Sequence, residues 1–172
     1  IERKGKLGLG TAYITGFKWS IEKGYDYIFE MDADFSHNPN DLPRLYKACH
    51  EEGADVSIGS RYVSGVNVVN WPMGRVLMSY FASKYVRFIT GLPIHDTTAG
   101  FVCYRRKVLE TIHLDHIRFK GYAFQIEMKF TAFKCGFHIT EVPVIFINRE
   151  LGTSKMNSSI FGEAVFLSLI HI

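Results

Sequence analysis

The feature that most constrains the fold is a regular alternation of helical and strand patterns along the 172 residues. Apolar residues recur every three or four positions, which predicts helices over residues 8–24, 41–53, 73–91, 122–136 and 158–166. Short runs rich in β-branched and aromatic residues predict strands over residues 25–31, 54–62, 100–106 and 138–149. Strands that alternate with helices indicate an α/β fold with a mixed, mostly parallel sheet and helices on its faces.

Composition limits the protein to a few classes. Hydrophobic residues make up 47% and charged residues 22%, so the chain can bury a core as a single domain. The net charge of +3 is small and dispersed, which argues against a nucleic-acid partner. The three cysteines lie far apart without a C-x-x-C motif, and this predicts free thiols rather than a zinc site. No apolar run reaches the roughly 20 residues of a membrane-spanning helix.

Two carboxylates close the first predicted strand. Asp32 and Asp34 are separated by one alanine, and like charges this close repel unless a cation lies beside them. Hard oxygen ligands suit Mg²⁺ or Mn²⁺, and ligands of α/β sheets bind beyond the carboxyl ends of the strands. D-x-D alone is common in surface loops, but its place after a buried strand favours a metal site. His37 is either a further ligand or an ordinary loop histidine, and Asn40 is predicted to cap the next helix.

Several cations are placed to meet phosphates. Arg61 ends the second predicted strand, at the same edge of the sheet as the two aspartates. Arg75 and Ser79 lie four residues apart on a predicted helix, so they can offer a guanidinium and a hydroxyl to one phosphate. Arg149 and Lys155 lie on a glycine-containing loop that can fold over a diphosphate. The alternatives are a solvated helix face and a basic surface loop.

Six motifs give a resemblance to a known family. They are GKLGLGTAYITGFK, EMDADFSHNP, IGSRYV, DTTAGFVCYRR, GYAFQIEM and PVIFINRELGTSKM, in that order. Together they resemble polyprenol-phosphate mannose synthases (dolichol-phosphate mannosyltransferases) of the inverting glycosyltransferase family 2, which has a Rossmann-like GT-A fold. The resemblance runs from residue 3 to residue 166, so residues 1–166 are expected to be a partial GT-A domain.

The family's N-terminal strands, with P-x-Y-N-E and D-D-G-S, are not found, so we expect a fragment truncated at the N-terminus that lacks the base-reading part of the site. Residues 167–172 match a translated sequencing adapter and are expected to be an artefact.

The resemblance implies a role for each site residue. Asp32 and Asp34 would bind the metal and, through it, the donor diphosphate, with Ser36 in the place where relatives commonly carry a metal-assisting glutamine. Asp96 falls in the D-x-x-x-G-F stretch that shapes the sugar pocket, and we count it among the donor-binding residues, with structural support as an equal alternative to sugar contact. Glu127, in the F-Q-x-E motif, is read as a positioning or structural residue.

The cations divide between the two substrates. Arg149 and Lys155 match the mobile-loop pair that closes on the donor phosphates. Arg61, Arg75 and Ser79 match the residues that hold the acceptor phosphate. The residues assigned to catalysis itself are Asp34, Arg61 and Arg75.

The implied reaction moves mannose from GDP-mannose to a polyprenyl phosphate with inversion. A phosphate acceptor is already ionised near pH 7, so no general base is required. A related transferase that uses UDP-glucose or another nucleotide sugar, a metal-dependent phosphohydrolase and a non-catalytic nucleotide-sugar binder remain alternatives.

The lipid acceptor implies a membrane surface, and we expect the cytoplasmic face, with peripheral attachment or an anchoring subunit or C-terminal extension. The predicted helix over 73–91 mixes aromatic, aliphatic and basic residues, as interfacial helices do, although an ordinary core helix is equally compatible.

Overall fold

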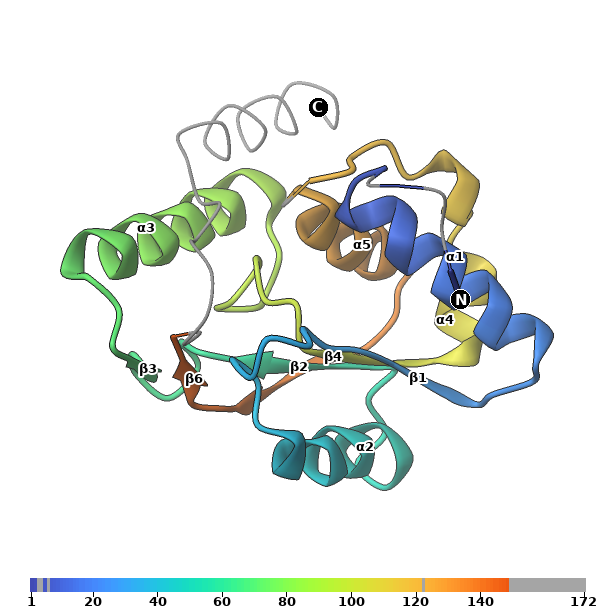
Figure 1. Cartoon of the computed structure of the whole chain (residues 1–172), viewed down its shortest axis with the longest axis horizontal. Coiled ribbons are helices and arrows are strands. Elements are labelled where there is room, and N and C mark those ends of the chain that lie inside the picture. The colour runs from blue at the N-terminus through green and yellow to red at the C-terminus, as the bar shows by residue number, and fades with distance from the viewer. Residues whose placement is uncertain (3–4, 6, 122, 149–172) are drawn as a thin grey trace.

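The computed structural model describes residues 1–2, 5, 7–121 and 123–148, and its elements follow the predicted alternation (Figure 1). The helices are α1 (Leu9–Glu22), α2 (Leu42–His50), α3 (Met73–Thr90), α4 (Arg106–Thr111) and α5 (Ala123–Lys134), with short 3-10 turns η1 (Pro39–Asp41) and η2 (Leu114–His116). The strands are β1 (Tyr27–Glu30), β2 (Val56–Ser60), β3 (Val68–Val69), β4 (Val102–Arg105), β5 (Ile139–Pro143) and β6 (Phe146–Ile147).

The main sheet is mixed, as predicted. Its strand order is β1-β4-β2-β5. β4 pairs antiparallel with both β1 and β2, whereas β5 pairs parallel with β2, so β1, β2 and β5 share one direction and β4 opposes them. β3 and β6 form a separate two-stranded parallel sheet, with Val69 opposite Ile147. The predicted α/β fold class is confirmed.

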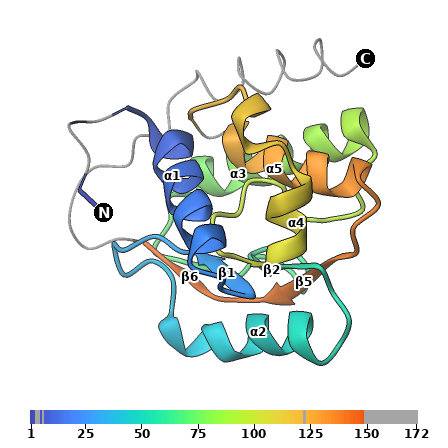
Figure 2. The same ribbon diagram turned by 90° about the vertical axis from the view of Figure 1, so that its right-hand side faces the viewer.

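Helices cover both faces of the main sheet. α2 lies on one face, and α1, α4 and α5 lie on the other, with α3 at the end near β3 and β6 (Figures 1 and 2). The larger core cluster fills the space under α1, α4 and α5 and includes Phe17, Tyr104 and Phe124. A smaller cluster beneath α2 includes Leu45 and Phe101. The sheet is therefore covered on both sides, and every residue of β2 and the first three residues of β4 are buried.

Local signals mark some of the element ends. Gly91 follows α3 in the left-handed region at φ 70°, which agrees with the predicted end of this helix at residue 91. Pro143 ends β5, an edge strand of the main sheet, where the missing N–H of proline is tolerated. The predicted Asn40 cap is wrong, because Asn38 caps the turn and its Oδ1 accepts the Asn40 N–H at 3.0 Å.

Other expectations can be compared with the described part of the chain. The cysteines are free thiols, as predicted. Within the described residues, no helix combines the length and apolarity needed to cross a membrane. The helix predicted over 158–166 and the expected artefact at 167–172 lie outside the described residues.

Candidate functional site

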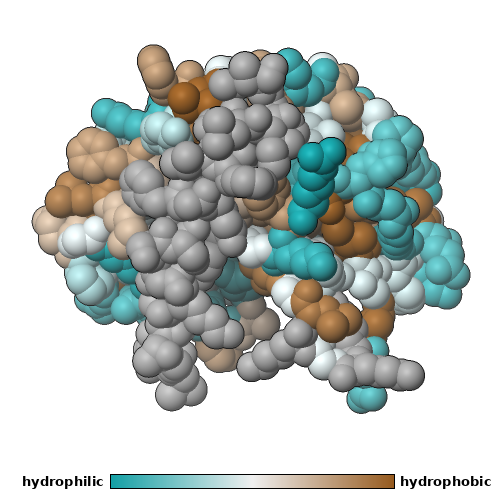
Figure 3. Space-filling model, turned by 90° about the horizontal axis from the view of Figure 1, so that it is seen from above, coloured by the Kyte–Doolittle hydropathy of each residue, from teal (hydrophilic) through white to brown (hydrophobic). Residues whose placement is uncertain are grey.

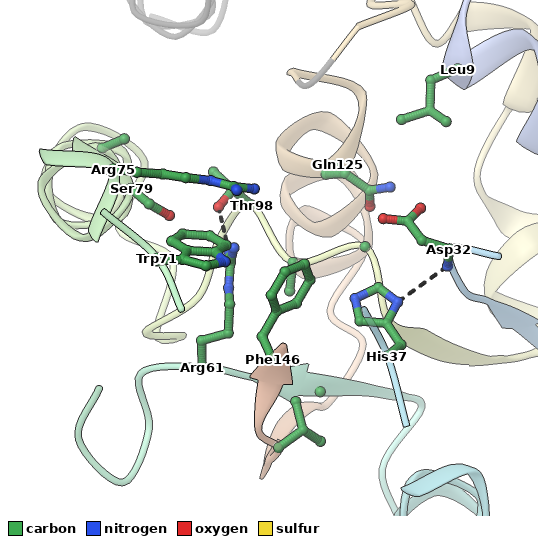
Figure 4. Close-up of a pocket in the computed structure, with 15 residues that line it drawn as sticks. Leu9, Asp32, His37, Arg61, Trp71, Arg75, Ser79, Thr98, Gln125 and Phe146 are labelled. Atoms are coloured by element: carbon green, nitrogen blue, oxygen red, sulfur yellow. Dashed lines mark hydrogen bonds between the residues drawn. The ribbon is translucent and has the colours of Figure 1, made fainter. Parts of the chain in front are cut away.

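One pocket lies at the end of the main sheet where β1 and β2 finish (Figure 4). Its walls come from α1, the loops after β1 and β2, α3, the loop before β4, α5 and β6. Four residues singled out from the sequence line it together: Asp32, Arg61, Arg75 and Ser79. Arg149 and Lys155 lie outside the described residues, so their assignment stays a prediction.

Asp32 is held at the pocket by two neighbours. The Tyr13 hydroxyl donates to its Oδ1 at 3.3 Å, and its own backbone N–H donates to Nδ1 of His37 at 3.1 Å. Burial, followed by the negative charges of Glu30 and Asp32, raises the pKa of Tyr13 far above its usual value. Tyr13 therefore remains a hydrogen-bond donor to this carboxylate at any physiological pH.

Asp34 is fixed by the turn that follows it. Its Oδ1 accepts the Ser36 backbone N–H at 3.1 Å and the Ser36 hydroxyl at 2.5 Å. Phe35 between them has a left-handed φ of 63° and a 90% exposed side chain, a conformation that disfavours bulky residues. Ser36 is buried and orients the carboxylate, while its predicted role as a metal ligand stays a prediction.

His37 serves as a neutral ring beneath Asp32. It is buried, stacks on Phe101 with ring centroids 4.9 Å apart, and meets Phe146 edge-on. Burial lowers the pKa of His37, against the nearby carboxylate charges that raise it. Because Nδ1 accepts the Asp32 N–H, the proton of the neutral ring lies on Nε2, which leaves no lone pair for a metal. Of the two alternatives for His37, the geometry favours a loop histidine that positions Asp32.

Asp96 and Arg61 form a buried ion pair. The Asp96 carboxylate accepts the Arg61 backbone N–H at 3.0 Å, Nε at 2.7 Å and Nη2 at 2.6 Å, and Thr98 accepts from the same Nη2. Burial raises the pKa of Asp96, but the charge and hydrogen bonds of Arg61 outweigh it and hold the pKa below its usual range. Asp96 is fully buried and does not line the pocket, so it acts there through Arg61. Its predicted contact with a donor sugar stays a prediction.

Trp71 joins the two arginines of the pocket. The Arg75 guanidinium carbon lies 3.8 Å from the indole centroid, and that of Arg61 lies 5.5 Å from it. Nη1 of Arg75 also donates to Asn148 Oδ1 at 2.9 Å. Sequence reasoning missed Trp71, although its place four residues before Arg75, next to a predicted helix start, was an available signal.

A buried polar group supports the pocket floor. Gln125 on α5 lines the pocket, and its Nε2 donates to Glu30. Lys129 is fully buried and donates to the Ala99 carbonyl at 2.6 Å and the Gln125 carbonyl at 3.1 Å. Burial lowers the pKa of Lys129 to about 8. Glu127 accepts two backbone N–H groups of the loop before α5, which agrees with the structural role expected for it.

Comparison with solved structures supports the fold. Glucosyl-3-phosphoglycerate synthase from Mycobacterium tuberculosis, crystallised with Mn²⁺ and UDP-glucose, superimposes with a TM-score of 0.62 at 16% identity, over 99% of this chain and 55% of that chain. The same enzyme crystallised with phosphoglyceric acid gives a TM-score of 0.55. At this identity the likeness establishes the GT-A architecture alone.

Comparison of sequences gives closer relatives. The chain is 50% identical over 166 residues to polyprenol monophosphomannose synthase of Mycolicibacterium smegmatis, covering 96% of the chain and 62% of that protein. It is also 50% identical over 165 residues to undecaprenyl-phosphate mannosyltransferase of Micrococcus luteus, covering 96% of the chain and 67% of that protein. The chain thus spans about two thirds of the length of these relatives. A family model described as glycosyl transferase family 2 matches residues 1–113, and together these matches show that the chain belongs to glycosyl transferase family 2.

Proposed function

We propose that this domain belongs to an enzyme that transfers mannose from GDP-mannose to a polyprenyl phosphate, with inversion at the anomeric carbon. The observation that carries the proposal is one pocket that gathers Asp32 with Arg61, Arg75 and Ser79, in a chain 50% identical to two proteins named for mannose transfer to polyprenyl carriers. The products are polyprenyl phosphomannose and GDP.

Asp32 and Asp34 fit a divalent cation. Asp32 lines the pocket, and Asp34 follows two residues later in the same loop, where the Ser36 N–H and hydroxyl donate to it. Two carboxylates leave room for phosphate oxygens and water, which matches the ligands that Mg²⁺ and Mn²⁺ prefer. When bound there, the cation would supply Lewis-acid stabilisation of the leaving diphosphate. The solved structural neighbour that contains Mn²⁺ and UDP-glucose is consistent with this assignment.

The cations of the pocket position the two anionic substrates. Arg75 and Ser79 project from one turn of α3 toward the pocket, where we assign them to the acceptor phosphate with Arg61. The acceptor oxygen needs no base, so these residues bind, orient and offset the repulsion between two phosphates. Arg149 and Lys155 are proposed to bind the donor phosphates.

The outer side of α3 is proposed to lie on the cytoplasmic face of a membrane. The side chains of Met73, Leu77, Phe81 and Phe88 are 47–86% exposed. The buried side of this helix is mostly small or polar: Ser79, Ala82, Ser83 and Val86. Figure 3 shows apolar surface at the end of the molecule where α3 lies. One helix would therefore contact the lipid and present Arg75 to its phosphate. An anchoring subunit or C-terminal extension would add to this attachment.

A transfer assay on the full-length enzyme tests the proposal. Asp34→Ala should lower Mn²⁺-dependent mannose transfer to polyprenyl phosphate by at least about a hundredfold, the usual effect of losing one fixed electrostatic contact. Asp115→Ala is the matched control, since Asp115 pairs with Lys18 in an exposed pair that does not line the pocket. Circular dichroism checks that both variants fold.

Two of the alternatives, another donor and a phosphohydrolase, each give a different result in the same assay. Transfer from UDP-glucose instead of GDP-mannose would identify a different donor. Release of inorganic phosphate without a lipid acceptor would indicate a phosphohydrolase. Unchanged transfer by the Asp34 variant would contradict the metal assignment.

A further inference from the structure

We propose that Trp71 helps to bind the phosphate of the acceptor lipid in two ways. Its indole N–H donates to a phosphate oxygen, and its ring stacks against Arg75 and positions that guanidinium. The inference rests on the proposed function and adds a residue that the sequence motifs did not assign. It combines three observations: the stacking of Arg75 on the indole, the buried indole N–H for which no described residue is an acceptor, and the side of the pocket on which Trp71 lies.

The ring of Trp71 stacks against Arg75. The Arg75 guanidinium lies over the indole at 3.8 Å from the centroid, the distance of close stacking. Phe146 packs its ring edge-on against the indole, with centroids 5.2 Å apart and an interplanar angle of 78°. The indole is therefore fixed by β6 on one side and holds Arg75 on the other.

The indole nitrogen of Trp71 is a buried donor without a protein acceptor among the described residues. Nε1 is shielded from solvent, and no oxygen in the described part of the chain accepts its hydrogen. An indole N–H can only donate, and buried donors are normally paired, so this group requires an acceptor. Trp71 lines the pocket, and a phosphate oxygen bound beside Arg75 would supply that acceptor.

The position of Trp71 selects the acceptor phosphate rather than the donor. Figure 4 shows Trp71, Arg75 and Ser79 on one side of the pocket and Asp32 with His37 on the other. Since the donor diphosphate is assigned to the metal at Asp32, the phosphate near Trp71 is that of the lipid. Trp71 also lies two residues before the start of α3, the helix whose outer side is proposed to contact the membrane.

Two substitutions separate the functions of the side chain. Trp71→Phe keeps an aromatic surface for Arg75 but removes the N–H, and Trp71→Leu removes both. In steady-state kinetics on the full-length enzyme, we expect Trp71→Phe to raise KM for polyprenyl phosphate about tenfold with little change in KM for GDP-mannose, and Trp71→Leu to raise it further. An unchanged KM for the acceptor, or an equal rise for both substrates, would overturn the proposal.

Fluorescence provides a readout that does not depend on transfer. The chain has two tryptophans, and Trp19 is 41% exposed on α1 against Tyr25, where it does not line the pocket. In a full-length variant in which Trp19 and any other tryptophan except Trp71 is replaced by phenylalanine, emission should change saturably when a short-chain polyprenyl phosphate is titrated in the absence of donor. Inorganic phosphate as a second titrant tests whether the phosphate group alone suffices. Emission that does not respond to the lipid phosphate would refute the contact with Trp71, even if the enzyme transfers mannose. A response without mannose transfer would leave the Trp71 contact intact and would refute only the proposed donor.

Discussion

Replacing Asp96 with asparagine would leave the Arg61 guanidinium buried without its counter-charge. Arg61 is 8% exposed and Asp96 is fully buried, and the carboxylate accepts three hydrogen bonds from Arg61. Breaking a buried pair by removing one partner costs about 3–5 kcal/mol. Because asparagine retains one acceptor oxygen and Thr98 still accepts from Nη2, we expect the lower end, about 3 kcal/mol. This is a large part of the roughly 5–15 kcal/mol by which domains are stable.

Urea unfolding followed by circular dichroism at pH 7 measures this loss as a lower midpoint at unchanged slope. The pKa of Asp96 in the folded protein is below its unfolded value, which is roughly 3.9. Its contribution is therefore fully present above the unfolded pKa and is lost as the pH falls through the folded pKa. The difference between wild type and Asp96→Asn should consequently shrink in acid.

The matched control is Asp115→Asn, which makes the same chemical change in an exposed pair and should leave the midpoint unchanged. A loss below about 1 kcal/mol for Asp96→Asn would show that buried Arg61 does not depend on the Asp96 charge in the folded protein. A difference that persists in strong acid would show that the loss arises from packing rather than from charge.

Two further predictions concern packing and the membrane. A Cβ at Gly10 would lie 2.7 Å from Cδ2 of Phe124, so Gly10→Ala should destabilise the protein by about 1–3 kcal/mol in urea unfolding. The control Gly16→Ala, in open space on the same helix, should stabilise it by about 0.5–1 kcal/mol. Equal effects of the two substitutions would contradict the close approach of α1 and α5. The double substitution Leu77→Ser and Phe81→Ser should weaken binding to phosphatidylglycerol vesicles, measured by co-sedimentation, about tenfold. Stability should not fall, because both side chains are about half exposed. Undiminished vesicle binding would place the membrane contact elsewhere.

The fold was predictable because its elements carry strong local signals, but the orientation of α3 was not. The apolar spacing of Val76, Leu77 and Phe81 predicted a helix, yet both Leu77 and Phe81 face outward. Small residues such as Ala82 form the inner side instead. Periodicity identifies a helix and its faces. Which face is buried depends on the elements that pack against the helix in the folded molecule.

The site was predictable where residues follow strands and not where they depend on tertiary packing. Asp32 and Arg61 come at strand ends, which topology brings to one edge of the sheet. The pairing of Arg61 with Asp96 joins residues 35 positions apart and leaves no local pattern. No local pattern marked Lys129, and only the packed structure shows that it is buried and donates to the Ala99 carbonyl.

The reversed direction of β4 increases the number of chain segments that reach the pocket at this edge of the sheet. In an all-parallel sheet only the segments that leave the strands reach the ligand side. Here β4 begins where β1 and β2 end, so the segment that enters it brings Thr98, Ala99 and Gly100 to the pocket between the loops that carry Asp32 and Arg61. Three adjacent strands thus contribute three consecutive walls. Substitutions in the segment before β4 can therefore reshape the middle of the pocket without changing the loops that follow β1 and β2.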